Sequence, residues 1–527
     1  MSGDEAKIKP EYPGPEEILK TEFSDNFQVT LALFMVLLTT VLAILLKQNK
    51  YLRTVTQLIP ESGMMLFFGV IVALIMAAID DSLVNGHVVD SIQLPHTIIQ
   101  HVLIAPIILH ASYELYHPHF FGQIGTILIM AVVATLLNTI IIGLSLRYIF
   151  GSLFPSMNIF HCMTFAPIIA AVDPVAVLAV FEVVNADKAL YFLVFGEALL
   201  NDGVTFVLYE GIKELATIPD EDMATVPIIS YVYVLLSFLT APLGGGLIGF
   251  VVGLASALVT KHTTEATAFL KPMLALLFAA LAYGLTIVFG FSNILGLIAY
   301  GLTQERYAFG NMTVKASILT SNIVHTVAII FETILFFILG CEFAAVGFYA
   351  VWDFALVVLF IIVISRILVT CGLCAIINRY TQRPINWKWQ TLIIVGGLRG
   401  AISFAMVVTY EGPFHKLFYD TTLVVIFFTT IANGIITKPL VNYLGLKAES
   451  GVHTDYGLYY GYDQYVPGCL ARGWGWLEDK IICRIFTKEN AMHDAIVKEI
   501  MADEEKEAFK ELQKERIHQK KPAMIVG

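Results

Sequence analysis

The stretch FGEALLNDGV, residues 195–204, places two acids and an amide inside an apolar run that extends from Tyr191 to Tyr209. The run is long enough to cross a bilayer as a helix. An ionisable group at membrane depth costs roughly 2.5–3.5 kcal/mol on insertion scales, so it needs a partner or a function. The preceding apolar run carries another acid, Asp173, in AAVDPVA at 170–176. Carboxylates on adjacent membrane segments predict a protein that carries a cation through lipid.

The composition predicts an all-α polytopic membrane protein. Hydrophobic residues make up 57% of the 527-residue chain and charged residues only 14%, and the mean hydropathy is +0.75. Soluble domains contain fewer apolar and more charged residues, whereas a protein with many lipid-facing helices needs this much apolar surface. Apolar segments of spanning length predict about thirteen transmembrane helices. Their approximate limits are 28–47, 63–80, 96–113, 121–150, 161–183, 188–213, 227–259, 268–290, 291–304, 318–340, 348–378, 389–410 and 420–441.

The basic residues near the helix ends orient these helices. With the first loop in the cytoplasm, alternation places eleven lysines and arginines near inner ends and three near outer ends. This excess is the positive-inside bias of a correct topology. The odd count then puts the N-terminus outside and the C-terminus in the cytoplasm. The inner residues are Lys47, Lys50, Arg53, Lys188, Lys261, Lys271, Arg306, Lys315, Arg379, Arg383 and Lys388, and the outer ones are Arg147, Lys213 and Lys416.

Four regions follow from the same patterns. Residues 1–27 are acidic and proline-containing, and they are predicted to be an extracellular disordered segment. Residues 28–447 form the transmembrane domain. Residues 448–475 are a cytoplasmic polar and aromatic linker, and residues 476–527 are a cytoplasmic helical tail with apolar residues at helical spacing.

Helical geometry separates the two acids of the 195–204 stretch. At 100° per residue, Glu197 and Asn201 share a face, while Asp202 lies about 140° from Glu197. We therefore expect the two acids to face different surroundings, and we take Asp202 as the ion-binding carboxylate. A desolvated carboxylate near neutral pH can hold a proton or exchange it for a small cation. Competition at one such site couples the two ions, and Asn201 adds amide dipoles without a second charge.

Pro174 and a later glycine cluster predict two interrupted membrane helices. Proline removes a backbone donor and clashes with the preceding turn, so a break is expected at Asp173–Pro174. Freed carbonyls can ligate a cation, and half-helix ends need countercharge, so Asp173 can serve a helix end, the ion or both. The second break is expected at Gly396, Gly397 and Gly400. The breaks fall in predicted helices 5 and 12, at matching positions of two six-helix halves (1–6 and 8–13), which is the pattern of an inverted-repeat transporter.

Three further charges lie in apolar runs of the later half: Glu332, Arg366 and Arg399. An arginine at membrane depth stays charged and needs a carboxylate or freed carbonyl oxygens. Arg366 is expected to pair with Glu197, the acid that faces away from Asp202. For Glu332 and Arg399, structural salt bridging is favoured over a direct role, and either role supports the core.

Two other patterns carry less weight. Gly245, Gly249 and Gly253 recur every fourth residue, which permits close helix packing equally well within one chain or between two. His101 and His110 lie on one apolar segment, where a packed hydrogen-bonding histidine is favoured over a pH sensor.

Three long motifs resemble those of the eukaryotic Na+/H+ exchangers, the NHE family within the cation–proton antiporter superfamily. The matching strings are AAVDPVAVLAVF at 170–181, VFGEALLND at 194–202 and GGLRGAI at 396–402. The likeness extends through most of residues 28–447. It implies a transmembrane antiporter domain that exchanges one Na+ for one H+ without net charge. It also implies a homodimer that works by elevator-like movement of core helices 4–6 and 11–13.

The resemblance also implies roles for individual residues. Asp202 carries over as the ion-binding carboxylate, and Asp173 as a second residue of the Na+ site. Asn201 beside Asp202 looks like the electroneutral version of the motif. Glu197 with Arg366 looks like the core ion pair of the family.

The remaining matches and departures concern the cavity mouth and the tail. Glu332 and Arg399 match positions tied to pH response and transport. His110 replaces an acid of the family in APIILHASY at 105–113, which changes the electrostatics of the pore mouth. After residue 447 the likeness fades. Segment 476–486 is similar in place and pattern to the segment where family members bind a calcineurin-B-like EF-hand protein, so such a protein is an expected partner.

The sequence thus predicts a multi-pass secondary antiporter of the plasma membrane that imports Na+, exports H+ and regulates intracellular pH and Na+. Its partners are the lipid bilayer and a second copy of the chain, with no nucleic acid. Neither an enzyme activity nor a resident cofactor is expected, since Na+ and H+ are cargo. No P-loop is found, which argues against an ATP-driven pump. The alternatives are a K+(Na+)/H+ exchanger of an endosomal membrane and a non-transporting membrane scaffold that acts through its tail.

Overall fold

The structure of the chain is a computed structural model, and every regular element that it describes is a helix. The described residues are 37, 41, 61–79, 98–151, 157–173, 178, 181, 187–216, 228–263, 270–346, 352–380, 384–397, 399–446 and 482–487. Segment 1–27, the linker 448–475 and most of segments 28–47 and 476–527 therefore lie outside the described residues.

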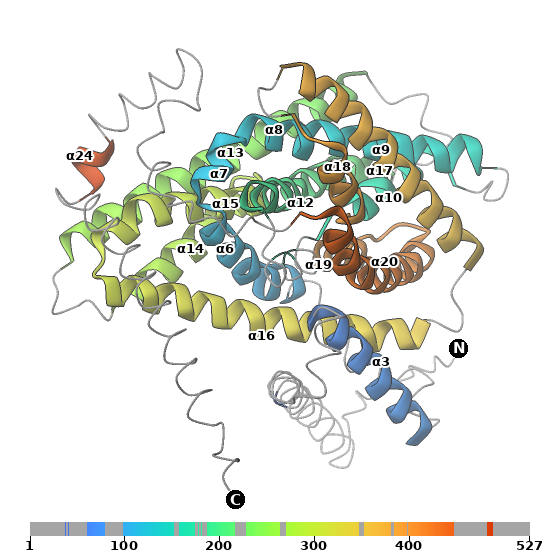
Figure 1. The fold of residues 1–527 in the computed structure, drawn as a ribbon, viewed down its shortest axis with the longest axis horizontal. Helices are drawn as coiled ribbons and strands as arrows, with labels where there is room; N and C mark the ends of the chain where they lie inside the picture. Colours follow the sequence, from blue (N-terminus) through green and yellow to red (C-terminus); the bar gives the residue numbers. More distant parts are fainter. Residues whose placement is uncertain are drawn as a thin grey trace, which may run out of the picture.

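The helices pack around α12, which Figure 1 shows near the centre of the molecule, and α16 is a long helix along one edge. In chain order, with η for π- or 3₁₀-helical turns, the elements are α3 (Glu61–Ile79), η2 (Ile99–Leu103), α6 (Ile104–Leu115), α7 (Pro118–Gly122), α8 (Ile124–Leu128), η3 (Ile129–Ala134), α9 (Thr135–Leu144), η4 (Ser145–Ile149), α10 (Ile159–Ala170), α12 (Lys188–Ala216), α13 (Ile228–His262), α14 (Lys271–Val288), α15 (Asn293–Thr303), η7 (Gln304–Ala308), η8 (Phe309–Asn311), α16 (Val314–Val346), α17 (Trp352–Tyr380), α18 (Trp387–Val395), α19 (Ala401–Val408), α20 (His415–Leu444) and α24 (Cys483–Phe486).

Seven described helices are long and apolar enough to cross a membrane, which confirms an all-helical polytopic membrane protein. They are Ile124–Ile149, Lys188–Lys213, Leu236–His262, Lys271–Val288, Lys315–Ala344, Trp352–Tyr380 and His415–Leu444, and two shorter apolar helices are Ser62–Ile75 and Ile159–Ala170. The predicted limits 318–340 and 420–441 are narrower than α16 and α20. These helices continue into flanking polar residues that a hydropathy pattern does not include.

Helix α13 shows how one sequence pattern divides into a lipid-facing side and a packed side. Five large apolar residues at helical spacing are each at least half exposed, as suits a face toward lipid: Leu236, Leu239, Leu243, Leu247 and Val251. The glycines of the same helix pack against α15. A methyl group on Gly249 would overlap the carbonyl oxygen of Gly296, and one on Gly245 would overlap that of Ser292. The glycine repeat therefore allows α13 to pack closely against α15 of the same chain.

Two segments interrupt their helices beside α12. Helix α10 ends at Ala170, and residues 171–173 are not helical. Asp173 precedes a proline, which disfavours helical geometry at that position; Pro174 itself lies outside the described residues. Helix α18 ends at Val395, and α19 begins at Ala401. Because α10 and α19 contact each other and both contact α12, the two interruptions lie close together.

Residues 482–486 lie against the helix bundle, in contact with α13 and η7. Ile482 is buried in a cluster with Ala257 and Tyr307. Nζ of Lys261 donates to the carbonyl oxygen of Ile485 at 2.7 Å, and Nδ2 of Asn311 donates to that of Phe486 at 2.7 Å. Part of the predicted partner-binding segment 476–486 is thus in contact with α13 and the turns after α15.

Candidate ion-binding site

A cavity of about 60 Å³ lies between α6, α12, α16, α19 and the chain that follows α10. This volume is enough for a few water-sized groups. Apolar side chains form most of its wall, and three carboxylates enter it. The lining residues are Ile104, Ile107, Ile108, Ala111, Ala171, Val172, Asp173, Leu199, Asp202, Glu332, Leu335, Phe336, Gly400, Ala401, Ile402 and Ser403.

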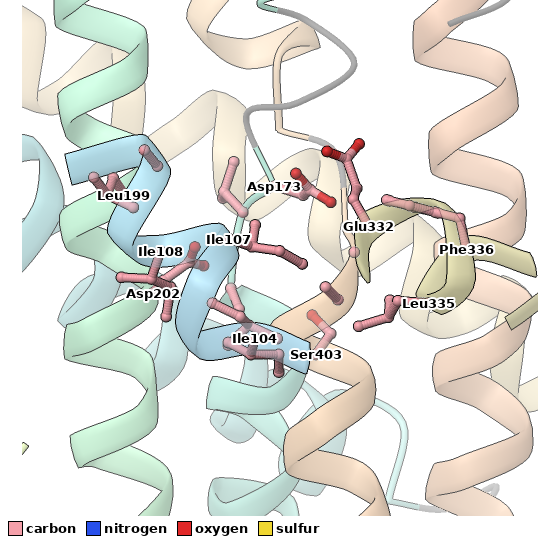
Figure 2. A pocket seen from close by; sticks show the side chains of 16 residues that line it. Ile104, Ile107, Ile108, Asp173, Leu199, Asp202, Glu332, Leu335, Phe336 and Ser403 are labelled. Carbon is pink, nitrogen blue, oxygen red and sulfur yellow. The ribbon is translucent and has the colours of Figure 1, made fainter. Parts of the chain in front are cut away.

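Asp202 reaches this cavity from α12 and is only 6% exposed. Figure 2 shows Asp173 and Glu332 with their carboxylates near each other, and in this view Ile107 of α6 is drawn between them and Asp202. In the ranges that the structure describes, no lysine, arginine or histidine forms an ion pair with Asp202. The guanidinium of Arg399 acts on Asp202 electrostatically, but it is hydrogen-bonded to the end of α10 and does not pair with the carboxylate. A buried carboxylate without a paired counter-ion is stabilised when a proton or a metal ion neutralises it. The carboxyl oxygens of Asp202, Asp173 and Glu332 are of the ligand type that a hard cation such as Na+ prefers.

Asn201 holds the non-helical chain beside the cavity in place. Its Oδ1 accepts a hydrogen bond from the backbone N–H of Val172 at 3.1 Å, and its Nδ2 donates to Oγ1 of Thr135. Asn201 is 1% exposed. Because the Val172 N–H no longer belongs to a helix, this amide supplies a partner that the broken helix lacks.

The two interrupted segments supply charge to each other's helix ends. Nη1 of Arg399 donates to the carbonyl oxygens of Ala170 and Ala171, at 2.7 and 2.8 Å, at the C-terminus of α10. A guanidinium there neutralises the negative end of the helix dipole. Asp173 lies against Gly400, the residue before α19, so closely that a methyl group on Gly400 would overlap its carboxylate. The carboxylate therefore lies at the positive end of α19.

Glu197 and Arg366 form a separate ion pair that does not line the cavity. Nη1 and Nη2 of Arg366 donate to the two carboxylate oxygens of Glu197 at 2.9 and 3.0 Å, and Nη2 also donates to the carbonyl oxygen of Ile393 at 3.1 Å. Glu197 is 2% exposed and Arg366 is 5% exposed. A buried, bidentate pair of this kind is strongly coupled and joins α12 to α17 and α18.

The structure divides the predicted site residues into two groups. Asp202, Asp173 and Glu332 share the cavity, with Asn201 and Arg399 holding the chain around it. The pair formed by Glu197 and Arg366 faces another part of the bundle.

Two other positions bear on the predicted helix breaks. Gly396 is the C-cap residue of α18, and its N–H donates a hydrogen bond to the carbonyl oxygen of Leu392 at 2.7 Å. Gly397 leaves room for the arginine side chain, since a methyl group there would lie 3.2 Å from Nε of Arg366.

Sequence reasoning missed Thr135, Thr429 and Ser403. Oγ1 of Thr429 accepts the backbone N–H of Arg399 at 3.2 Å, and Ser403 lines the cavity. Single hydroxyls in apolar helices are common and mostly bond to their own helix, so no pattern in the sequence marks these residues.

Interrupted helices, a buried carboxylate cavity and an apolar exterior define the class of polytopic membrane transporters. A profile described as "Sodium/hydrogen exchanger, transmembrane" matches residues 35–443. The chain therefore belongs to the sodium/hydrogen exchanger family, as the three motifs predicted.

Similar proteins come from animals and from an archaeon. The chain is 34% identical to sodium/hydrogen exchanger 3 of Homo sapiens over 75% of its own length and 47% of that protein. It is 31% identical to the Na(+)/H(+) exchanger beta of Oncorhynchus mykiss, over 80% of the chain and 55% of that protein. The chain thus spans about half the length of these relatives. Among solved structures, the sodium proton antiporter MjNhaP1 of Methanocaldococcus jannaschii has a TM-score of 0.61 at 18% identity, covering 80% of this chain and 100% of its own, so the fold is shared.

Proposed function

We propose that this chain is an electroneutral secondary antiporter that takes up Na+ and exports H+ by alternating access at Asp202. The observation that carries the proposal is a buried carboxylate in a cavity, with no cationic side chain paired to it among the described residues. Such a group must bind a mobile cation or a proton to be stable in the bundle. Since one group holds one or the other, uptake of Na+ requires loss of the proton.

The neighbouring residues support a one-for-one exchange. Asn201 is occupied by two hydrogen bonds and brings no charge, and Arg399 is occupied by the end of α10. Asp202 is then the group whose state changes, while Asp173 and Glu332 shape the electrostatics of the cavity. Replacing one H+ by one Na+ leaves the charge of the carrier unchanged, so the exchange would not respond to membrane voltage.

The test uses purified protein in proteoliposomes with an internal pH dye. Asp202→Asn should insert and fold but lose Na+-dependent proton flux, because an amide takes up no proton near neutral pH and has no negative charge to neutralise Na+. Glu210→Gln is the matched control: it lies two turns further along α12, is partly exposed and pairs with Lys213. Full exchange by Asp202→Asn, or equal loss in the control, would contradict the proposal. A potential clamped with valinomycin should leave the wild-type rate unchanged.

The choice of Na+ over K+ is a separate part of the proposal. It is supported by the family match and by the small cavity with oxygen ligands. Parallel fluxes in Na+, K+ and Li+ gradients decide between this function and a K+(Na+)/H+ exchanger. A faster rate in K+ would favour the endosomal alternative. Deletion of residues 456–527 tests the scaffold alternative, since an antiporter core should keep some exchange without them.

We extend the proposal to the assembly of the protein. The proposed architecture has thirteen spans in two inverted six-helix halves, with the N-terminus outside, in a homodimer of the plasma membrane. The two neighbouring helix interruptions and the likeness to an antiporter fold support the two inverted halves of this architecture. Cysteine accessibility at both ends of the chain tests the topology, and native mass measurement in detergent tests the dimer.

A calcineurin-B-like partner at 476–486 is also proposed. Ile485 is 48% exposed, which leaves apolar surface for such a partner while Ile482 packs inward. Co-purification with and without Ile485→Glu tests the contact.

A further inference from the structure

A cluster of two histidines and a glutamate joins α6 to α16 beside the cavity. Nδ1 of His325 and Nε2 of His110 are 2.8 Å apart, and the same Nε2 lies 3.5 Å from Oε1 of Glu114. One ligand atom from each of the three residues lies within 4.8 Å of the other two. The exchange of ions at Asp202 does not use this cluster.

The chemistry of the three side chains is that of a transition-metal site. Imidazole nitrogens and a carboxylate oxygen are the ligands of catalytic and regulatory zinc sites, commonly three from the protein with one position left to water. With Zn–N distances of about 2.0–2.1 Å, tetrahedral ligand atoms lie roughly 3.3 Å apart. The nitrogen–oxygen separation of 3.5 Å fits this value, and the 2.8 Å nitrogen pair needs to open by about half an ångström.

The placement of the three residues also suits a metal. His110 and Glu114 are four residues apart on α6, so they face the same side, and His325 comes from α16, which contacts α6. His110 is partly buried, with 17% of its side chain exposed, whereas Glu114 and His325 are exposed. Ionisable side chains at membrane depth face the bundle or a water-filled cavity rather than lipid, so a metal ion can reach the two exposed ligands from water. The part-buried imidazole limits the freedom of the ligands.

We propose that His110, Glu114 and His325 form a binding site for Zn²⁺ or a similar divalent transition metal that clamps α6 to α16. Both helices line the ion cavity: Ala111 adjoins His110, and Glu332 lies two turns beyond His325. Given the proposed antiport, which requires the walls of this cavity to move, a metal bridge between the two walls slows exchange. The site then acts as an inhibitory metal sensor.

Metal binding is tested first, and independently of transport. Zn²⁺ titration by calorimetry and visible spectra of bound Co²⁺ are recorded on the purified chain, residues 1–527, in detergent. His110→Ala and His325→Ala should each remove one binding site, or weaken it about 100-fold or more, because even outer-shell partners of a metal are worth 10–100-fold. Glu114→Gln should weaken it less. His262→Ala is the control, since this exposed histidine bonds to a carbonyl of its own helix.

Unchanged metal binding in both alanine variants would overturn the proposal, as would equal loss in His262→Ala. The folding of each variant is checked by size-exclusion profile and by exchange in metal-free buffer. In proteoliposomes with Zn²⁺ on both sides, exchange by wild type and His262→Ala should slow, and exchange by His325→Ala should not. Zn²⁺ binding without any effect on exchange would overturn the inhibitory role. If no exchange is seen in any vesicle, the proposed antiport fails, while the calorimetry still decides the metal site.

Discussion

Replacing Arg366 by methionine should strongly destabilise the helix bundle, because Glu197 would be left charged and unpaired. The two side chains make two hydrogen bonds of 2.9 and 3.0 Å, and both are almost fully buried, so solvent screens little of the interaction. Removing one partner of such a pair costs about 3–5 kcal/mol of unfolding free energy. Glu197→Leu alone should cost a similar amount, since an arginine does not release its proton.

The double variant Glu197→Leu/Arg366→Met distinguishes a paired charge from two independent losses. Replacing both partners by apolar residues is often neutral, but here the carbonyl of Ile393 also loses its donor. That loss costs about 1–3 kcal/mol. The two single variants sum to about 6–10 kcal/mol, so the coupling energy should be at least about 3 kcal/mol.

The assay is equilibrium unfolding in mixed micelles with increasing SDS, followed by tryptophan fluorescence. Glu210→Gln is the control, because its ion pair with Lys213 is partly exposed and should be worth about 1 kcal/mol or less. If the double variant lost the full sum of the single variants, the two charges would not stabilise each other and the reasoning would be wrong.

Three further predictions concern the cavity. Gly400→Ala should lower the exchange rate about 100-fold by displacing the Asp173 carboxylate, whereas Gly372→Ala, with nothing within 4 Å of the added methyl group, should not; initial proton flux measures both. Asn201→Ala should lower the unfolding free energy by about 1–3 kcal/mol, since the Val172 N–H loses its partner, and SDS unfolding measures this; an unchanged midpoint would show that another group replaces the amide. The half-saturating Na+ concentration should rise by up to about tenfold per unit of falling pH, because H+ competes for the same carboxylate; a value independent of pH would mean separate sites.

Much of the membrane architecture could be predicted because bilayer thickness and hydropathy restrict helices to long apolar runs. The family also follows from three motifs, and the comparisons confirm it. The ends of α16 and α20 could not be placed, since polar residues continue a helix beyond the apolar window. The glycine repeat of α13 was equally compatible with two contacts, and only the position of α15 decides between them.

At the site, too, the sequence predicts which side chains matter but not all of their partners. Helical periodicity separates Glu197 from Asp202, and in the structure the two face different surroundings. The sequence predicts that Arg399 pairs with either a carboxylate or freed carbonyl oxygens and cannot decide between them. In the structure its guanidinium donates to the carbonyl oxygens at the end of α10. The apolar segment predicts a hydrogen-bonding histidine at His110, and this is confirmed, but its partner His325, 215 residues away, could not be predicted. No local pattern can reveal such a partner.

The reciprocal contacts between the interrupted segments have a consequence for recombination between homologues. Arg399 caps the segment that precedes Asp173, and Asp173 in turn lies at the start of the segment that follows Arg399. Each segment therefore supplies a charged group to the helix end of the other, and the two depend on each other for their positions. A chimaera that receives residues 157–216 from a distant homologue should assemble poorly unless residues 384–446 come from the same donor.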